Sequence, residues 1–402
     1  MAICAHIVGE TPVPLWGLSS HERYRRMLKH AGMTAMVEDV SSVAPGDSVL
    51  IIRGDFLFDG RVLQSLANSL NVMLEASAGP TRQIVAAHVP ANLARQASTI
   101  LSGGKRSDTL PGVRIEKIED RSESFNEHLR KSQPLFVEPI RPDTQRALEE
   151  RLFSSSYKGI TDLVTKWLWP VPAKWATRLC VAGGVMPNHV TTFSIVLVVV
   201  AGALFANGFY AWGLLASWIM TFLDTVDGKL ARVTITSTRL GHFLDKILDI
   251  VHPPFWYLLW GIGLASFQPV LPSLTLNIII GAIFIGYIAG RLIEGGFQLW
   301  FGNFGIFCWR PFDSYNRLVT ARRNPNLILL TISLLINRPD MGLVAVAAWT
   351  VLSSLLLLVR LGVAFRTRVV HGPLHSWLAD GVEKAGARSL AVRLFTQHVP
   401  TR

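Results

Sequence analysis

Apolar and polar positions alternate on two different length scales along this chain. From about residue 189 onward, long apolar runs are separated by short polar connections; they cover about 189–206, 209–231, 242–267, 274–298, 325–337 and 341–363. Most of these runs reach the length of about 20 residues that a helix needs to cross a bilayer. The fifth run is shorter, so tilt or local thinning of the bilayer must complete it. The pattern predicts six transmembrane helices.

The first 150 residues contain shorter apolar runs, of strand length. SVLIIRG (48–54) and RQIVAAHV (82–89) are two such runs, and polar segments with a helical pattern lie between them. HERYRRMLKHAG (21–32) is an amphipathic segment that ends at Gly32, a residue that suits a helix C-terminus. Strands that alternate with helices predict a small α/β domain over residues 1–150.

Two further segments flank the apolar runs. Residues 151–188 mix tryptophan, lysine and arginine with short apolar stretches, a composition typical of an interfacial helix and linker. In the tail, 367–402, a basic amphipathic helix can form over residues 374–394, although two glycines weaken it. The predicted domains are therefore 1–150, 151–188, 189–366 and 367–402.

Composition and charge agree with a membrane protein that has a soluble part. Of 402 residues, 50% are hydrophobic and 17% charged, with a mean hydropathy of +0.35. The formal charge of +11 suits nucleic acid, anionic lipid headgroups or phosphorylated substrates. Given six apolar runs, we favour lipid and phosphate and expect no nucleic-acid partner.

Lysine and arginine distinguish the two sides of the membrane. The connections before the first run, after the second, after the fourth and after the last are basic, whereas the loops between them carry only Arg338. The positive-inside rule then places both termini, and the connection between the second and third runs, in the cytoplasm. We expect an α-helical integral membrane domain of six helices, in a bacterial inner membrane, preceded by a cytosolic α/β domain.

Four carboxylates interrupt the second and third apolar runs. Asp224 and Asp227 are three residues apart and Asp245 and Asp249 four apart, so each pair lies on one face of a helix. Four unpaired carboxylates inside a membrane would cost on the order of 10 kcal/mol. The spacing therefore calls for cations, and hard oxygen ligands suit two Mg²⁺ or Mn²⁺ ions about 3.5 to 4 Å apart.

The order of residues around these carboxylates resembles the signature of the CDP-alcohol phosphotransferase family, D-x-x-D-G-x-x-A-R-x8-G-x-x-x-D-x-x-x-D. The matching positions are Asp224, Asp227, Gly228, Ala231, Arg232, Gly241, Asp245 and Asp249. The resemblance implies a homodimeric membrane enzyme that transfers a substituted phosphoryl group from a CDP-linked donor to an alcohol and releases CMP.

The resemblance also implies roles for individual residues. Asp224, Asp227 and Asp245 correspond to metal ligands, and Asp249 corresponds to the general base and can also serve as a ligand. The residues expected to bind the donor are Asp227, Gly228, Ala231, Arg232, Gly241, Asn188 and Thr191. Simpler interpretations stay open for some of them: Arg232 as a membrane anchor, and Asn188 and Gly241 as residues of helix starts.

The first 150 residues resemble, more weakly, a sugar-phosphate nucleotidyltransferase, and Asp55 lies where that family carries a metal-binding aspartate. The loop GETPVPLWGLSS (9–20) lacks the glycine-rich pattern and the lysine that hold nucleotide phosphates in that family. We therefore expect a degenerate domain. Lys158, Thr161 and Asp162 resemble the junction found where such a domain is fused to an inositol-phosphate member of the phosphotransferase family.

Other charged residues have two interpretations each. A basic group on the connection after the fourth run either receives an anionic acceptor, such as a phosphorylated polyol, or enforces topology; its members are Arg310, Arg317, Arg322 and Arg323. Arg291 and Glu294 form an internal ion pair or face a polar cavity. His242 and His252 are interpreted as histidines packed between helices.

The predicted function is metal-dependent transfer of a phosphatidyl or phospho-polyol group, in phospholipid or inositol-phosphate-type synthesis. One alternative is a bifunctional enzyme whose first domain also makes the CDP-activated donor. An alternative of another class is a cation transporter that uses intramembrane aspartates. The glycine, alanine and arginine positions at fixed spacing disfavour the transporter, since ion passage does not require them.

Overall fold

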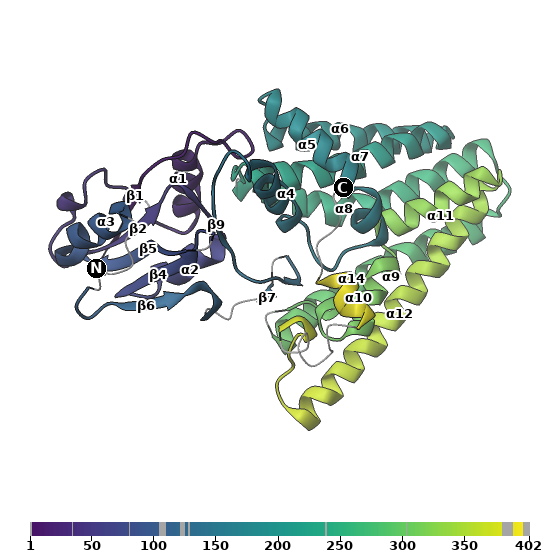
Figure 1. Ribbon diagram of the computed structural model, residues 1–402. Helices are drawn as coiled ribbons and strands as arrows, with labels where there is room; N and C mark the ends of the chain where they lie inside the picture. The colour runs from purple at the N-terminus through teal and green to yellow at the C-terminus, as the bar shows by residue number, and fades with distance from the viewer. Residues whose placement is uncertain are drawn as a thin grey trace. The chain divides into compact units, whose positions relative to one another are not determined.

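The computed structural model describes residues 2–33, 35–79, 81–103, 110–120, 125–127, 129–237, 239–302, 304–379 and 389–396, except for the side chains of 239–248. It contains two compact units (Figure 1). The first unit comprises Met1–Ser124, Gln133–Ser155 and Val233–Thr236. The second comprises Phe125–Ser132, Ser156–Arg232 and Ser237–Arg402.

A mixed five-stranded sheet forms the centre of the first unit. Its strands are β1 (Ile3–Val8), β2 (Ser48–Arg53), β4 (Val72–Ser77), β5 (Arg82–Pro90) and β6 (Arg114–Lys117), in the spatial order β1-β2-β5-β4-β6. β1 runs parallel to β2 and β4 parallel to β6, while β5 is antiparallel to both of its neighbours. Five of the six residues of β2 are buried, as expected for an inner strand covered on both faces.

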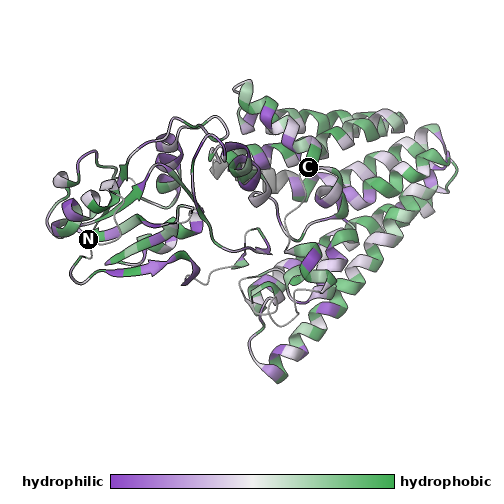
Figure 2. Ribbon diagram, in the orientation of Figure 1, coloured by the Kyte–Doolittle hydropathy of each residue, from purple (hydrophilic) through white to green (hydrophobic). Residues whose placement is uncertain are grey.

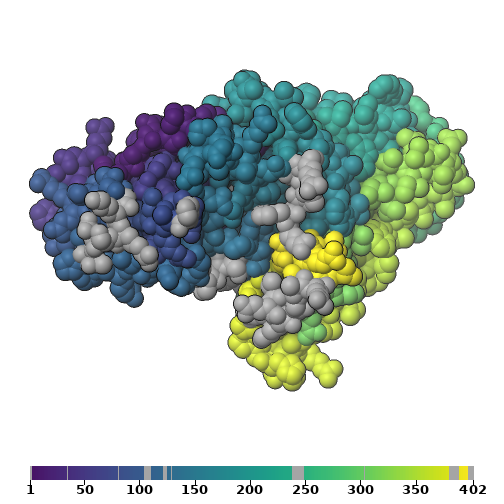
Figure 3. Space-filling model, viewed as in Figure 1, coloured from purple at the N-terminus to yellow at the C-terminus, as the bar shows by residue number. Residues whose placement is uncertain are grey.

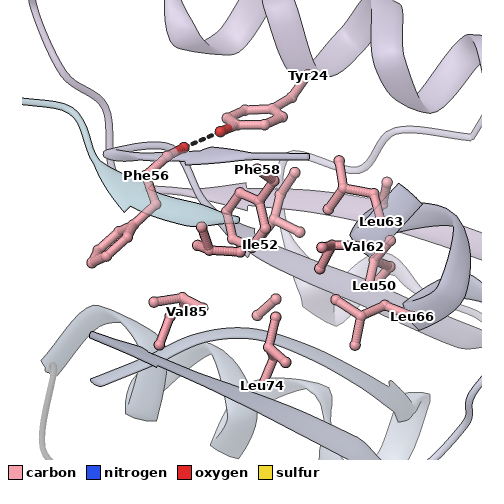
Figure 4. Close-up of a cluster of buried hydrophobic side chains, with 14 of the residues drawn as sticks. Tyr24, Leu50, Ile52, Phe56, Phe58, Val62, Leu63, Leu66, Leu74 and Val85 are labelled. Atoms are coloured by element: carbon pink, nitrogen blue, oxygen red, sulfur yellow. Dashed lines mark hydrogen bonds between the residues drawn. The ribbon is translucent and has the colours of Figure 1, made fainter. Parts of the chain in front are cut away.

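Helices cover both faces of this sheet. α1 (Ser20–His30) and α2 (Gly60–Ala67) contribute to one buried cluster, and α3 (Ala94–Gly103) contributes to another. In the first cluster, the Tyr24 hydroxyl donates a hydrogen bond to the carbonyl of Phe56 (Figure 4). The prediction of an α/β domain is confirmed, because the apolar runs that predicted strands form β2 and β5.

Smaller elements complete the first unit. They are the strands β3 (Phe56–Phe58) and β9 (Val137–Pro139), the helix α4 (Gln145–Ser155) and the 3₁₀ turns η1 (Val40–Ser42), η2 (Ala91–Leu93) and η3 (Ile118–Asp120). β3 pairs with β9 in antiparallel register.

Helices dominate the second unit. Those in the positions of the six apolar runs are α6 (Pro187–Ala206), α7 (Tyr210–Val233), α8 (Arg239–Phe267), α9 (Ser273–Phe301), α11 (Arg323–Leu335) and α12 (Pro339–His371). Shorter elements are η4 (Val164–Leu168), α5 (Pro170–Ala182), η5 (Ile306–Cys308), α10 (Pro311–Val319) and α14 (Leu390–Phe395). Residues 380–388, where much of the predicted amphipathic tail helix falls, lie outside the described residues.

Three helices of the described chain, α6, α9 and α12, are long and apolar enough to cross a membrane by length and composition. Apolar colouring extends along the helices of this unit (Figure 2). Large apolar side chains on α9, such as Leu274 and Ile285, each keep 72% of their surface exposed, a pattern that suits contact with lipid. α11 has 13 residues, about 20 Å of helix, and is shorter than a bilayer core of about 30 Å.

Aromatic side chains hold α6 and α8 together. Phe205 of α6 contacts Trp256 and Trp260 of α8, with ring centroids 6.2 and 5.0 Å apart. The indole of Trp256 donates to the carbonyl of Val198 at 2.9 Å. Because each indole N–H needs a partner in an apolar interior, such bonds fix the helices in one register.

A hairpin from early in the sequence belongs to the second unit. Its strands are β7 (Phe125–Asn126) and β8 (Lys131–Ser132). The Gly159 amide donates to the Leu129 carbonyl at 2.8 Å, and a Cβ added to Gly159 would lie 2.7 Å from the Arg130 carbonyl. Only glycine permits so close an approach, so the hairpin is fixed against the segment that precedes the spans.

The C-terminal end of the described chain packs in the same unit. α14 (yellow in Figure 3) contributes Phe395 to a buried cluster with Trp309 and Trp377, and the hairpin residue Phe125 packs against this cluster. Phe395 contacts Trp377 with ring centroids 6.4 Å apart. Segments far apart in the sequence, the hairpin and α14, therefore complete this part of the helical unit.

Candidate active site

Two of the predicted aspartates lie one turn apart near the C-terminal end of α7. Asp227 is buried, with 6% of its surface exposed, and accepts a hydrogen bond of 2.8 Å from the Thr191 hydroxyl of α6. That hydroxyl also approaches the Pro187 carbonyl at 3.1 Å. Because α6 begins at Pro187, the first turn of this helix places Thr191 against α7 and orients the Asp227 carboxylate.

The second pair of aspartates lies on α8. The Asp249 side chain is 44% exposed, which leaves its carboxylate accessible to solvent and to a substrate. Gly241 and Asp245 belong to the same helix, but their side chains lie outside the described residues. Their predicted roles therefore stay predictions.

Arg323 joins the two aspartate-bearing helices. Its Nη1 donates to Asp249 Oδ1 at 2.8 Å, and its Nη2 forms an ion pair with Asp224. The guanidinium is only 14% exposed, and the Asp224 carboxylate 18%. A single cation at the start of α11 thus holds together one carboxylate from α7 and one from α8.

The sequence did not identify Arg323 as a partner of the aspartates. It was interpreted as one of four basic residues on the connection after the fourth apolar run. The signal that was available is its position next to the shortest apolar run. A charged residue at the end of so short an apolar run lies next to apolar side chains, where an ion partner lowers its cost.

A buried polar group adjoins Arg323. Asn324 Nδ2 donates to Asp162 Oδ1 at 3.0 Å, and Asp162 also accepts bonds from the amide and hydroxyl of Thr165, at 3.0 and 2.9 Å. Burial opposes ionisation of Asp162, but the charge of Arg317 and these bonds outweigh it, so the pKa of Asp162 lies below its usual value. The junction residue Asp162 therefore anchors the start of α11.

α9 contributes a second set of charges beside Asp249. Arg291 lies 3.9 Å from Glu294, the internal ion pair considered from the sequence, and Arg322 also pairs with Glu294. Arg291 Nη2 donates to the backbone carbonyl of Asp249 at 3.4 Å. The Tyr287 hydroxyl donates to the neighbouring carbonyl of Ile250 at 2.9 Å. α9 thus supports the backbone that carries Asp249.

The C-terminal end of α7 holds the segment before α5. Lys229 Nζ and Arg232 Nη1 each donate to the Ser156 carbonyl at 3.2 Å. Lys229 also lies over the ring of Tyr157, 3.6 Å from its centroid. A Cβ added to Gly228 would lie 3.4 Å from Arg232 Nη1, so Gly228 and the arginine are neighbours on this face of α7.

The remaining predicted residues are more peripheral. Asn188 is exposed at the start of α6, and Ala231 is half-buried on α7. His252 is buried and contacts Trp256 of the same helix, with ring centroids 4.7 Å apart. Arg310 is exposed and lies over the ring of Trp309, 4.4 Å from its centroid.

The donor set suits a hard divalent cation. Asp224, Asp227 and Asp249 supply carboxylate oxygens from two adjacent helices, the chemistry that Mg²⁺ and Mn²⁺ prefer. Among the side chains that the structure describes, no group of three His, Cys, Asp or Glu residues is close enough to bind a metal, and Asp245 falls outside that search. Arg323 supplies the positive charge between Asp224 and Asp249, so the residues fit a cation at this position.

The α/β unit holds its predicted metal-binding aspartate differently. Arg53 binds both carboxylate oxygens of Asp55, with Nε–Oδ1 and Nη2–Oδ2 distances of 2.9 and 2.6 Å. The loop after β1, where nucleotide phosphates would bind, buries Leu15 and Trp16 in a hydrophobic cluster and against Phe153. Asp59 caps α2 through the Arg61 amide at 3.0 Å.

Comparison with known proteins identifies the central part of the helical unit. Residues 184–301 match the sequence model of the CDP-alcohol phosphatidyltransferase family. These residues are therefore a CDP-alcohol phosphatidyltransferase domain, which confirms the resemblance seen in the eight-residue signature.

Three relatives match part of the chain. The chain is 32% identical over 118 residues to the phosphatidylinositol phosphate synthase of Mycobacteroides abscessus, across 29% of this chain and 54% of that protein. It is 40% identical over 70 residues to the phosphatidylinositol phosphate synthase of Streptomyces avermitilis, across 17% of this chain and 28% of that protein. It is 28% identical over 171 residues to the archaetidylinositol phosphate synthase of Pyrococcus horikoshii, across 41% of this chain and 79% of that protein. The chain thus spans about half of the first relative and less of the second.

Proposed function

We propose that this protein transfers a substituted phosphoryl group from a CDP-linked donor to an alcohol, with release of CMP, in a metal-dependent reaction of phospholipid synthesis. One observation carries the proposal. Asp224 and Asp249 come from different helices of the family-matched domain and meet at a single guanidinium. Both helices therefore present a carboxylate to the same buried cation, which supports a site where acidic groups from α7 and α8 act together.

Asp249 is the proposed general base. Its carboxylate is the more exposed of the two that contact Arg323, so an alcohol can approach it. Asp249 takes the proton of the attacking hydroxyl while the alcohol oxygen bonds to the β-phosphorus of the donor. The bond from that phosphorus to the bridging oxygen breaks, and CMP leaves with the electron pair.

The four aspartates are the proposed ligands of the metal ions. Asp224, Asp227, Asp245 and Asp249 would bind two Mg²⁺ or Mn²⁺ ions, which would neutralise the diphosphate and the charge that develops on CMP. Thr191 orients Asp227 through its hydrogen bond, and Arg232 and Gly228 lie where the donor is expected on α7. Asn188, Ala231 and Gly241 are proposed to line the same donor site.

The acceptor is proposed to be a phosphorylated polyol. Two of the relatives are phosphatidylinositol phosphate synthases, and two arginines, Arg323 and Arg291, contact Asp249 in this structure. Burial lowers the pKa of Arg317 to about 10, and the negative charge of Asp249 opposes this shift. Arg291 donates a hydrogen bond to the backbone carbonyl of Asp249. Arginines of this kind bind phosphate oxygens with two parallel hydrogen bonds.

The α/β unit is proposed to be catalytically inactive. Arg53 neutralises Asp55, and apolar side chains fill the loop that would hold a nucleotide. We further propose six membrane spans with both termini in the cytoplasm, and a homodimer in a bacterial inner membrane.

The test is the release of CMP by the purified full-length protein. The protein in detergent or nanodiscs would be incubated with Mg²⁺, a CDP-linked lipid and either inositol 1-phosphate or glycerol 3-phosphate. CMP that depends on both metal and acceptor is expected. Absence of CMP with every acceptor, together with cation flux in liposomes, would establish the transporter instead. Pyrophosphate from CTP and inositol 1-phosphate would reveal an active α/β unit.

A further inference from the structure

The connection between the two aspartate-bearing helices belongs to the α/β unit. α7 ends at Val233 and α8 begins at Arg239, so a short connection joins them, of which residues 234–237 are described. Val233–Thr236 packs as part of the α/β unit, whereas the helices on either side belong to the second unit. The unit that we propose to be catalytically inactive therefore contains the turn between the two pairs of aspartates.

Arg23 of α1 binds the end of α7. Its Nη2 donates to the Val233 carbonyl at 3.2 Å and to the Leu15 carbonyl at 2.7 Å. The last carbonyls of a helix have no partner within that helix, and the negative end of the helix dipole favours a cation there. Arg23 is 2% exposed, and although burial lowers its pKa to about 10, the guanidinium stays charged at neutral pH. Arg23 therefore connects the loop after β1 to the C-terminal end of α7.

Arg26 binds the next carbonyl of the chain. Its Nη1 donates to the Thr234 carbonyl at 2.7 Å, while its Nε pairs with Glu22 Oε1 at 2.6 Å. Glu22 lies one turn earlier on the same helix, so this ion pair orients the guanidinium. Two arginines that are one turn apart on α1 thus bind two successive carbonyls at the end of α7.

The turn that follows has a backbone conformation that its sequence does not favour. Ile235 is left-handed, with φ of 52°, which is uncommon for a β-branched residue. The hydroxyl oxygens of Thr234 and Thr236, on either side of it, lie 2.7 Å apart. A strained backbone of this kind persists only where surrounding contacts hold it. The bonds from Arg23 and Arg26 to the adjacent carbonyls are contacts of this kind.

Both ends of this turn lead to the candidate active site. Asp227 precedes Val233 by about 9 Å of helix, and Asp249 lies on the helix that follows the turn. A shift of the turn would change the separation and rotation of α7 and α8, and with them the place where Asp224 and Asp249 meet Arg323. A misplacement of about 1 Å between reacting groups can cost about 10²-fold in rate.

We propose that Arg23 and Arg26 are positioning residues, which hold the turn between α7 and α8 so that the aspartates of both helices face one site. This inference rests on the proposed function, because it gives the α/β unit a part in that reaction without any chemistry of its own. Neither arginine contacts a substrate in this role. Each acts through a backbone carbonyl at the end of α7.

The test uses Arg26→Gln in the full-length protein, because the Arg26 side chain is 30% exposed and its removal leaves the core intact. With inositol 1-phosphate as acceptor, kcat for CMP release is expected to fall about tenfold while its KM changes less than about twofold, since the turn positions reacting groups and binds no substrate. Arg26→Lys should restore part of kcat. In the Arg26→Gln background, Ile235→Asn should do the same, because asparagine adopts a left-handed backbone more readily.

Arg25→Gln is the matched control, because Arg25 lies on the same helix, pairs with the same Glu22 and is 64% exposed. An equal kcat in Arg26→Gln and Arg25→Gln would overturn the proposal. So would a rise in the KM for inositol 1-phosphate that accounts for the whole loss of activity in Arg26→Gln.

Hydrogen exchange provides a readout that does not depend on turnover. Amides over residues 230–236 should exchange faster in Arg26→Gln than in Arg25→Gln, while amides of β2 keep their protection. Unchanged exchange over 230–236 would overturn the inference, and so would loss of protection throughout the α/β unit, which would show that Arg26 only stabilises its own fold. If the wild type releases no CMP, the proposed function fails, whereas this comparison still decides whether Arg26 holds the turn.

Discussion

Each unit of this protein contains an aspartate held by an arginine, and the two arrangements differ in how the partners are connected. In the α/β unit, Arg53 and Asp55 are two residues apart at the end of one strand. In the helical unit, Arg323 reaches Asp224 and Asp249 across 99 and 74 positions of sequence. A local pair forms wherever the strand forms, whereas the shared guanidinium depends on the packing of three helices.

The difference determines which carboxylates keep an oxygen that their arginine does not bind. Both oxygens of Asp55 are bound by its own neighbour, so another cation has little to gain there. Asp224 and Asp249 each have one contact to Arg323, and Asp249 keeps 44% of its side chain exposed. We propose that a carboxylate pair bridged from a separate helix can exchange one cation for another.

The largest expected effect comes from Asp249→Asn. This change removes the base but keeps the shape of the side chain, so kcat for CMP release should fall by at least about 10²-fold. Affinity for the CDP-linked donor, measured by equilibrium binding, should change much less. Near-normal turnover would contradict the assignment of Asp249 as the base.

Arg323→Gln should reveal the exchange of cations. In metal-free buffer the variant should lose about 1 to 3 kcal/mol of stability, because Asp224 keeps its charge without its nearest cation. Thermal unfolding in detergent measures this, and Mg²⁺ should stabilise the variant more than the wild type. Arg338→Gln is the control, since Arg338 is 53% exposed in its pair with Asp340 and its loss should cost under about 1 kcal/mol. Equal responses to Mg²⁺ in Arg323→Gln and wild type would contradict the exchange.

Lowering the pH should destabilise the α/β unit selectively. His88 is buried in β5; its Nδ1 donates to the Leu66 carbonyl at 2.9 Å, and its Nε2 lies 2.9 Å from the Ser48 hydroxyl oxygen. Burial lowers the pKa of His88. The folded state therefore binds fewer protons than the unfolded state, and stability falls as the pH drops below about 6.5, by at most about 1.4 kcal/mol per pH unit.

Hydrogen exchange of the full-length protein between about pH 7 and 5 would measure this effect. Amides of β2 and β5 should lose protection in the wild type, and the pH dependence should shrink in His88→Gln but not in His21→Gln, because His21 is exposed. Amides of α6 provide the internal comparison in the helical unit. Loss of protection in both units together would show that another group controls the response.

The smallest effect is expected from Asp55→Asn. The pair is partly exposed, with 16% of the Arg53 side chain and 36% of the Asp55 side chain accessible, so stability should fall by less than about 1 kcal/mol. CMP release should stay within about twofold of the wild type. A large loss of activity would mean that the α/β unit takes part in catalysis after all.

Much of the fold could be predicted because hydrophobic burial has a periodic signature. The apolar run 48–54 became β2 (Ser48–Arg53), and the run 189–206 became α6 (Pro187–Ala206). In each case polar or helix-initiating residues bound the apolar run, so the limits of the element were visible in the sequence. The positions of the four aspartates on α7 and α8 followed from the same helical spacing.

The partners of these aspartates could not be predicted in the same way. Arg323 contacts Asp249 although 74 positions of sequence separate the two residues. Hydropathy does not specify which faces of α7, α8 and α11 pack together. The same limit applies to the hairpin of β7 and β8. A two-stranded hairpin within the first 150 residues has no sequence feature that assigns it to the helical unit.

The hairpin also has a consequence for how the two units can be exchanged by recombination during evolution. The chain passes from one compact unit to the other and back more than once, since Phe125–Ser132 belongs to the helical unit and Gln133–Ser155 to the α/β unit. No single crossover point in the gene separates the two. A recombination that replaces the first 150 codons would also exchange this hairpin, so a lineage that acquired a new α/β unit would acquire a new segment of its helical unit with it.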